Sequence, residues 1–330
     1  MISIEEIAIK CGVSVSTVSK ALNDRNDVSK ATKEKIIKVA EETGYTTNVL
    51  ARSLRTKRTY NIGIILNNID GSFSHAFFSN VLESIQKEAE KYNYDITFIN
   101  SDLGGKKISY LKHCEYRNFD GVIIIYTDFE SKDIKDLINS NIPVVTIDHI
   151  FEECSSIMSD NISGMSELVD YAISMGHKKI AYIHGEDTKV GRDRLAGFYS
   201  SMHAHKLEIP KEYLKESVFR DTVLTESKTR ELLELKDPPT CIIFPDDYSS
   251  ISAIRTIQKR NIDISYMGYD GINIAKDIDL TTYEQDRTKL GKLAVTKLIR
   301  CIENPDDPIE RTVISGKVRI GNTVKNINEC

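Results

Sequence analysis

The chain has 330 residues, of which 40% are hydrophobic and 28% are charged, and its formal net charge is −5. This length allows two or three domains, and the charge as a whole does not suggest a protein that binds nucleic acid. The charge is unevenly divided, however, because residues 1–60 hold 11 of the 44 Lys and Arg but only 7 of the 49 Asp and Glu. The first 60 residues are therefore basic and the rest is acidic, a division that points to a separate function for the head, although chance clustering would give the same count.

The sequence contains no signal for a membrane or a metal. No segment is apolar over the roughly 18 residues that a spanning helix needs, and the opening MISIEEIAIKCG lacks the features of a signal peptide. The six cysteines are scattered, without a CxxC pair or the spacing of a zinc site. We expect a cytoplasmic chain with free thiols, without a cofactor or a metal.

The first 45 residues carry helical signals only. Apolar residues recur at the spacing of one helical face within residues 4–11, and Ser3 with Glu6 forms a capping box before them. Ser14 and Ser29 are suitable N-caps for two further helices. The pattern predicts a compact three-helix head.

The predicted second helix, within CGVSVSTVSKALN (11–23), is rich in small hydroxyl side chains. A helix, a short turn with glycine and a second helix form a helix-turn-helix, whose second helix lies in the major groove of DNA. Small side chains at its start let the backbone approach, so Val15 and Ser16 are expected to face the bases and Lys20 to donate to guanine. The residues expected to contact phosphates are Ser14, Thr17, Ser19 and Asn23. The alternative is a small helical cap with a polar face.

From Tyr60 onward, short apolar runs alternate with amphipathic stretches, which predicts parallel sheets with helical connections. The expected strands lie at 62–66, 95–99, 121–126, 142–148, 179–185, 240–244, 264–270 and 280–285. The expected helices lie at 77–92, near 106–117, and at 131–140, 162–175, 192–204, 222–235, 248–260 and 286–302. Because the pattern restarts near residue 160, we expect two doubly wound α/β lobes with a ligand in the cleft between them.

These signals predict three parts: a helix-turn-helix head at 1–46, a linker at 47–59 and a body at 60–330. The lobes are expected at about 60–158 plus 287–312 and about 159–286 plus 313–330. The linker carries four Lys and Arg within 52–58 and no acid. A solvated linker alone would show the same composition.

The head resembles the DNA-binding head of the LacI family, the lac-repressor and purine-repressor type of bacterial transcriptional regulator. The matching stretches are IEEIAIKCGVSVSTVSKALN (4–23), VSKATKEKI (28–36), ETGY (42–45) and NVLARSLRTKRT (48–59). The last resembles the family's hinge helix, in which a leucine, here Leu54, inserts between base pairs from the minor groove and kinks the duplex. The hinge residues that the resemblance implies for DNA binding are Asn48, Ala51, Arg52, Leu54 and Arg55. Thr47 stands where many members have proline.

The resemblance continues through the body, which the family implies to be like a periplasmic sugar-binding protein. Its marks include FDGVIIIY (119–126), IPVVTID (142–148), PPTCIIFPDD (238–247) and ISYMGYDGI (264–272). The residues it implies for ligand binding are Asp148, Arg194, Asp246 and Asp270, with Phe73 and Phe219 as an apolar wall. Carboxylates facing an arginine suit the hydroxyls of a sugar, whereas each aspartate alone could equally cap the next helix.

The sequence therefore predicts a DNA-binding transcriptional repressor that works as a homodimer on a near-palindromic operator. We expect a small ligand, a sugar, to control it. A protein partner or a non-sugar metabolite remains the alternative controlling partner. Enzyme motifs such as GxGxxG after a strand, GxSxG and HExxH are absent from the sequence, and a glycosidase pair of Asp246 and Asp270 would not account for the head. The operator, the regulated genes and the choice between inducer and co-repressor stay open.

Overall fold

The computed structural model describes residues 2–22, 27–45, 58–66 and 76–328. The chain divides into two compact units, Met1–Tyr60 and Asn61–Cys330, which are described separately. No helix in the described ranges is long and apolar enough to cross a membrane.

The head is the predicted three-helix unit, with α1 (Ile4–Cys11), α2 (Val15–Leu22) and α3 (Lys30–Glu42). The capping box of Ser3 and Glu6 is present. Ser29 Oγ likewise accepts the backbone N–H of Thr32 at the start of α3. The head core consists of Ile7, Ala8, Cys11, Val18, Ala21 and Ile36, contributed by all three helices.

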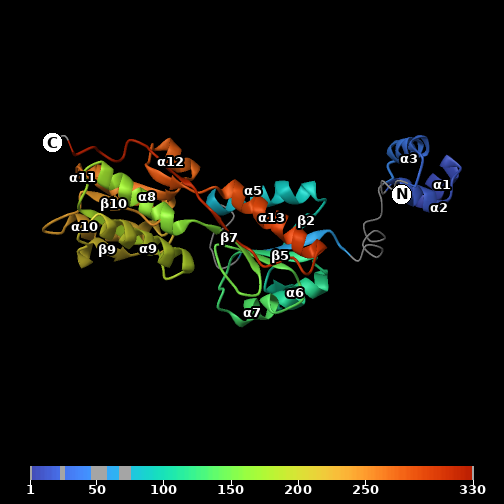
Figure 1. The fold of residues 1–330 in the computed structure, drawn as a ribbon, viewed down its shortest axis with the longest axis horizontal. Helices are drawn as coiled ribbons and strands as arrows, with labels where there is room; N and C mark the ends of the chain where they lie inside the picture. Colours follow the sequence, from blue (N-terminus) through green and yellow to red (C-terminus); the bar gives the residue numbers. More distant parts are fainter. Residues whose placement is uncertain (1, 23–26, 46–57, 67–75, 329–330) are drawn as a thin grey trace. The chain divides into compact units, whose positions relative to one another are not determined.

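The first lobe of the body is built on a six-stranded sheet with the order β13-β7-β6-β5-β1-β2, in which all neighbouring strands are parallel. Its strands are β1 (Asn61–Leu66), β2 (Asp95–Phe98), β5 (Gly121–Tyr126), β6 (Val144–Ile147), β7 (Ser155–Ser159) and β13 (Arg311–Ile314). Helices α5 (Ala76–Lys91) and α13 (Arg287–Glu303) cover one face, and α6 (Tyr110–Arg117) and α7 (Lys132–Ile138) cover the other (Figure 1). The central strands are buried on both faces, which explains their continuous apolar sequence.

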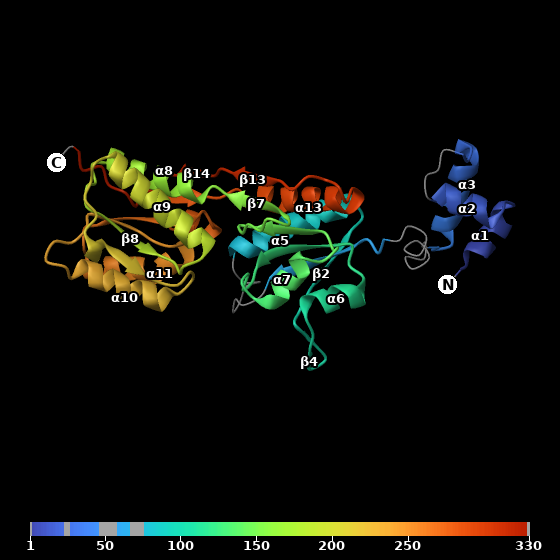
Figure 2. The ribbon, with the colours of Figure 1, turned by 60° about the horizontal axis from the view of Figure 1, so that its bottom comes forward.

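The second lobe is built on a sheet with the order β14-β12-β11-β10-β8-β9, and only the pairing of β14 with β12 is antiparallel within it. Its strands are β8 (Ile180–His184), β9 (Leu214–Glu216), β10 (Cys241–Ile243), β11 (Ser265–Asp270), β12 (Thr282–Glu284) and β14 (Lys317–Arg319). Its helices are α8 (Asn161–Ser174), α9 (Lys189–Ala204), α10 (Thr222–Leu233), α11 (Asp247–Arg260) and the short α12 (Asn273–Asp277), with a 3₁₀ turn at Lys211–Tyr213. Figure 2 shows α8 and α9 on one face of this sheet and α10 and α11 on the other.

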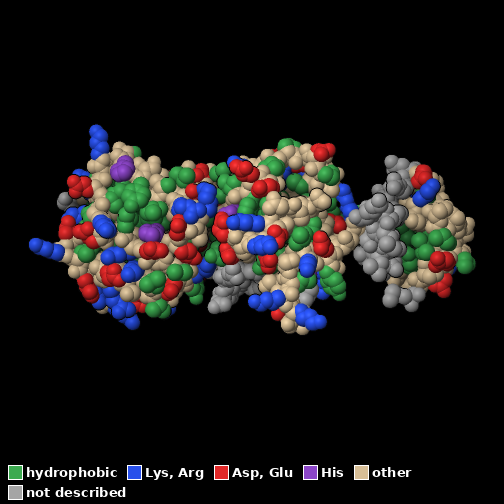
Figure 3. All heavy atoms as spheres, turned by 90° about the horizontal axis from the view of Figure 1, so that it is seen from below, with side chains coloured by type: hydrophobic (Ala, Val, Ile, Leu, Met, Phe, Trp, Pro, Cys, Tyr) green, Lys and Arg blue, Asp and Glu red, His purple; other side chains and the backbone are tan. Residues whose placement is uncertain are grey.

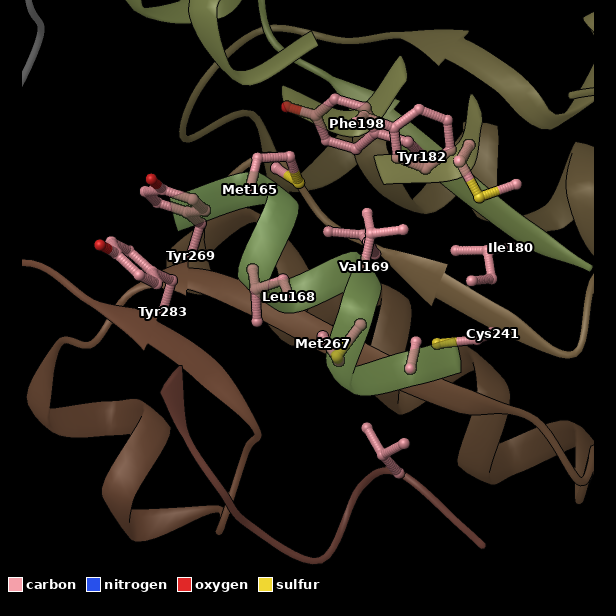
Figure 4. Close-up of a cluster of buried hydrophobic side chains, with 14 residues drawn as sticks. Met165, Leu168, Val169, Ile180, Tyr182, Phe198, Cys241, Met267, Tyr269 and Tyr283 are labelled. Carbon is pink, nitrogen blue, oxygen red and sulfur yellow. The ribbon is translucent and has the colours of Figure 1, made fainter. Parts of the chain in front are cut away.

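The second lobe has a hydrophobic core on each face of its sheet, and one of them lies between α8, α9 and the sheet. Met165, Leu168 and Val169 of α8 are fully buried with Tyr182 and Phe198, whose rings stack at 5.3 Å between centroids (Figure 4). This packing fixes α9 against the sheet, and α9 carries Arg194.

The close approach of α8 and α9 depends on Gly197. A Cβ at this position would clash with the carbonyl oxygen of Ile162 and lie 3.1 Å from the Cβ of Met165. Because the obstacle is backbone, Gly197→Ala is expected to lower the free energy of unfolding by about 1–3 kcal/mol. Urea unfolding followed by circular dichroism measures the change, with Ala196→Ser on the exposed side of α9 as the control. Equal stability of the two variants would contradict this account.

The structure corrects the sequence prediction in several places. The helix expected near 106–117 begins only at Tyr110, because β3 (Asp102–Leu103) and β4 (Lys106–Lys107) form a hairpin before it. Gly104 and Gly105 have φ of 60° and 79°, and Asp102 Oδ1 accepts the N–H of Gly105 at 2.8 Å. The helix expected at 192–204 begins three residues earlier, at Lys189, after the N-cap Thr188.

Each lobe of the body is built on one sheet, so the strands of the two sheets show where the chain passes from one lobe to the other. The predicted limits between residues 158 and 159 and between 312 and 313 fall inside β7 and β13, and both strands belong wholly to the first sheet. The chain crosses from one lobe to the other three times: from β7 to α8, from β12 to α13, and from β13 to β14. The separate linker at 47–59 stays a prediction, because 47–57 lie outside the described residues.

Candidate functional site

The predicted DNA-reading residues lie on the face of α2 that points away from the head core. Val18 and Ala21 are buried, whereas Val15 is 40% exposed and Ser16 and Lys20 are also exposed. An apolar side chain that is exposed beside serines at a helix start is consistent with a surface reserved for a partner. The structure thus leaves Val15, Ser16 and Lys20 accessible, and their contact with DNA stays a prediction.

Two of the predicted DNA contacts, Ser14 just before α2 and Lys20 within it, also have roles inside the head. Ser14 Oγ accepts the N–H of Thr17 at 3.2 Å and lies 2.8 Å from the hydroxyls of Ser16 and Thr17. Lys20 Nζ is 2.6 Å from a carboxylate oxygen of Asp27, and both side chains are about half exposed. A contact of Lys20 with a base therefore requires this ion pair to open.

Ser19 is partly buried on the same helix, and the other predicted DNA contacts fall outside the described residues. Those outside are Asn23, Asn48, Ala51, Arg52, Leu54 and Arg55. The wedge role of Leu54 accordingly stays a prediction from the sequence.

The body contains a cleft at the carboxyl ends of its parallel strands, lined by residues of both lobes. Its free volume is about 830 Å³ with the open mouth included, which is within the range of small-molecule sites. Five of the six predicted ligand residues line it: Asp148, Arg194, Phe219, Asp246 and Asp270. Phe73 lies outside the described residues.

Arg194 is the most enclosed cation of the cleft, at 4% exposure. Its Nε donates to Asn161 Oδ1 at 2.9 Å, its Nη1 to the carbonyl oxygen of Pro245 at 2.9 Å, and its Nη2 to Asp270 Oδ1 at 3.3 Å. The guanidinium lies over the ring of Tyr269, 3.7 Å from its centroid. These contacts hold one orientation and leave two of the five N–H groups of Arg194 without a protein acceptor within the described residues.

Asp270 ends β11 and faces Arg194. Its Oδ1 also accepts a hydrogen bond from Gln285 Nε2 at 2.7 Å, whereas its Oδ2 has no donor within the described residues. Burial raises the pKa of Asp270 to about 6, and the charge of Arg194 limits the rise. The backbone φ of 107° at Asp270 is rare for a side-chain-bearing residue, as is often found where a structure holds a functional group in place.

The other two aspartates are largely occupied by protein donors. Asp148 accepts the N–H of Ser159 at 2.6 Å and its hydroxyl at 3.2 Å, and burial raises the pKa of Asp148. Asp246 caps α11 by accepting the N–H and hydroxyl of Ser249, at 2.7 and 2.6 Å. The capping alternative therefore holds for Asp246, although the same residue lines the cleft.

Asp247, next in sequence, turns away from the cleft. It is fully buried, and its carboxylate accepts the N–H of Ile272 at 2.9 Å and the hydroxyl of Thr282 at 2.6 Å. Its two bonds tie the start of α11 to β12 and to the segment after β11. Its role is to hold the strand ends that present Asp246 and Asp270.

The walls of the cleft contain residues that the sequence did not single out. Phe77, Phe78, Tyr126 and Phe129 come from the first lobe, and Lys189 and Arg220 come from the second. The aromatic wall was not predicted because these residues are spread over three segments, each of which looks like ordinary core sequence.

His149 also lines the cleft. Its ring stacks on Phe129 with centroids 3.9 Å apart and planes 1° apart. Burial lowers the pKa of His149, so this ring is mainly neutral near pH 7. It adds a flat surface to the aromatic wall. His75 is outside the described residues.

No group of three or more His, Cys, Asp or Glu in the described part of the chain is arranged to hold a metal ion. Cys11, Cys114, Cys154, Cys241 and Cys301 are free. Burial raises the pKa of Cys114 and of Cys154 to about 12, so both thiols are protonated at neutral pH and are poor nucleophiles.

Comparison with protein families gives two matches that together span almost the whole chain. Residues 59–330 match the model described as periplasmic binding proteins and sugar binding domain of LacI family, and residues 3–48 match bacterial regulatory proteins, lacI family. The chain belongs to the LacI family. It is a DNA-binding transcriptional regulator with a ligand-binding body, and the predicted fold class is confirmed.

Individual relatives of this LacI-family chain are distant but cover its full length. The probable repressor ExuR of Bacillus subtilis is 28% identical over 338 residues, covering 99% of both chains. The repressor PurR of Vibrio parahaemolyticus is 28% identical over 343 residues, covering 99% of this chain and all of its own. The lac repressor dimer bound to operator and an anti-inducer is similar in structure, with a TM-score of 0.79 at 22% identity over 98% of this chain and 99% of its own.

Proposed function

We propose that the chain is a bacterial repressor that binds a near-palindromic operator as a homodimer and is controlled by a sugar-like ligand in the cleft. Two heads about one helical turn apart read the half-sites, and α2 enters the major groove. Because the operator is chromosomal, the protein acts in the cytoplasm, and its body binds a ligand without transforming it. The same fold with a protein or non-sugar effector is the alternative.

The charges of the molecule support the assignment of DNA binding to the head. Residues 1–60 hold an excess of four positive charges, whereas the rest of the chain is acidic. Figure 3 shows acidic and basic side chains interspersed over one face of both lobes. DNA binding requires basic groups gathered on one surface, and that condition favours the head and its linker over the body.

The observation that carries the ligand assignment is the Arg194–Asp270 pair at the cleft wall. Among the described residues, two N–H groups of Arg194 and Oδ2 of Asp270 have no protein partner, so they offer a donor and an acceptor close to each other. Adjacent donors and acceptors of this kind recognise a hydroxyl group, which both donates and accepts. Flat aromatic rings on the opposite wall suit the apolar face of a sugar ring.

The lobe arrangement suggests how the ligand controls DNA binding. The ligand contacts residues of both lobes, so it favours one angle between them over another. The angle affects the spacing of the two linkers in a dimer, and that spacing decides whether their hinge helices form on DNA. Coupling of this type is typically worth about 1–3 kcal/mol.

The experiment separates ligand binding from DNA binding. Arg194→Gln with Asp270→Asn is expected to abolish the response of operator binding to the ligand while leaving ligand-free operator binding unchanged. The control is Arg260→Gln with Glu234→Gln, which removes an exposed pair 3.1 Å apart in the same lobe. If the response survives in the first double variant, the controlling partner binds outside this cleft.

A further inference from the structure

Arg220 is a second cation of the cleft and, unlike Arg194, has no acidic partner among the residues that the structure describes. It lies in the loop between β9 and α10 and lines the cleft. Its guanidinium carbon is 5.5 Å from the ring centroid of Phe78 and 5.6 Å from that of Tyr126. Both rings belong to the first lobe, whereas Arg220 belongs to the second. Ring contacts attract the cation but do not neutralise its charge.

The backbone holds Arg220 in this place. Its φ is 68°, in the left-handed region that a residue with a Cβ rarely occupies. The N–H of Arg220 donates to Asp246 Oδ2 at 2.8 Å, and this bond fixes the strained conformation. A strained residue that the structure secures in a ligand cleft is more consistent with a binding role than with a chance loop position.

The carboxylates of the cleft do not satisfy the guanidinium of Arg220. Both oxygens of Asp148 accept from Ser159, and those of Asp246 accept from Ser249 and from the backbone of Arg220. Only Asp270 Oδ2 lacks a donor within the described residues. Lys189 is the third cation that lines the cleft, and it forms an ion pair with Asp193.

Within the described part of the chain, the cleft therefore offers more donors than acceptors, and the fork of N–H groups on Arg220 has no hydrogen-bond acceptor there. Guanidinium forks bind carboxylate and phosphate groups through paired hydrogen bonds. We propose that the ligand is a sugar-sized polyol bearing an anionic group, and that Arg220 binds this group while Arg194 and Asp270 bind hydroxyls. This inference rests on the proposed ligand-controlled function. Because Arg220 faces rings of the opposite lobe, the anion lies between the lobes.

The test is titration calorimetry of the full-length protein with D-glucuronate, D-gluconate and glucose 6-phosphate, and with glucose as the neutral probe. At least one anionic probe is expected to bind roughly tenfold or more tightly than glucose, because a hydrogen bond between charged groups is stronger than a neutral one. Its affinity should fall with added salt, unlike that of glucose. Preference for the sugar acids or for the phosphate identifies the source of the anionic group.

Arg220→Gln is expected to weaken binding of the preferred anionic probe roughly 10- to 100-fold and to leave the affinity for glucose within a few fold. Arg220→Lys should restore part of the preference, because it keeps the charge and loses the fork. The control is Arg230→Gln, an exposed arginine of the same lobe. Thermal unfolding of each variant checks that it is folded.

The inference is overturned if none of the three anionic probes binds more tightly than glucose, or if Arg220→Gln keeps the preference. Operator binding, measured on the same preparations, separates this failure from failure of the proposed function. If the protein binds its operator and responds to a neutral sugar, the proposed function stands and only the proposal of an anionic ligand is wrong. If the protein binds no DNA sequence specifically, the proposed function itself is contradicted.

Discussion

Arg194→Gln is expected to lower the free energy of unfolding of the body by about 3–5 kcal/mol at pH 7.5, the range for loss of one partner from a buried ion pair. The side chain is 4% exposed and donates to Asn161, Pro245 and Asp270. Its removal leaves the buried Asp270 carboxylate without its ion-pair partner and the Pro245 carbonyl without its donor. Ligand binding should be lost in the same variant, because the hydroxyl-binding donors are gone.

The measurement is urea unfolding followed by circular dichroism, since the chain has no tryptophan for fluorescence. The informative comparison adds Asp270→Asn, which removes the unpaired charge. We expect the double variant to be more stable than Arg194→Gln alone, because the two neutral amides carry no buried charge. A double variant that is less stable than the single one by the full cost of Asp270→Asn would show that the two residues are not coupled.

Asp270 is expected to make the body less stable by about 2 kcal/mol at pH 7 than at pH 4, judged from its pKa values in the folded and unfolded states. The folded-state pKa is raised to about 6, mainly by burial, whereas an unfolded aspartate titrates near 3.9. Below about pH 3 the carboxyl is protonated in both states, and its stabilising effect is complete. Between about pH 4 and pH 6 the unfolded state releases its proton first, so stability falls as the pH rises.

The check is the free energy of unfolding as a function of pH in the wild type and in Asp270→Asn. Asp148 and Asp247 also have pKa values raised by burial, so the slope of the wild type contains their contributions as well. The difference between the two curves isolates Asp270, and it should change between about pH 4 and pH 6 and be flat above. Parallel curves would contradict the assignment of a buried, partly compensated carboxyl at this position.

The sequence predicts most of the fold because parallel strands buried on both faces are written as continuous apolar runs. GVIIIY (121–126) is such a run and forms β5 at the predicted residues. Strand β7 was missed because its sequence SSIMS is mostly polar, although all five residues are buried. The same holds for the edge strands β13 and β14, whose exposed residues give no apolar run.

The candidate site was predicted from the family resemblance, and the ends of parallel strands support that prediction for some residues only. Asp270 ends β11 and Asp246 follows β10, whereas Arg194 lies within α9. Arg220 follows the three-residue β9 and has a left-handed backbone that its residue type does not indicate. The pairing of its side chain with Phe78 and Tyr126 depends on how the lobes close together, which no local pattern encodes.

The most direct test of the account is selection of bound DNA from a random duplex pool at a fixed salt concentration, repeated with neutral sugars, sugar acids and sugar phosphates. The account predicts enrichment of a near-palindromic sequence whose recovery changes with a ligand of this kind, and loss of that change in the Arg194 and Asp270 double variant. If a palindrome is enriched but its recovery does not change with any ligand, the DNA-binding function is supported and the ligand assignment is contradicted. Failure to enrich any sequence would contradict the central claim that the head reads a specific operator.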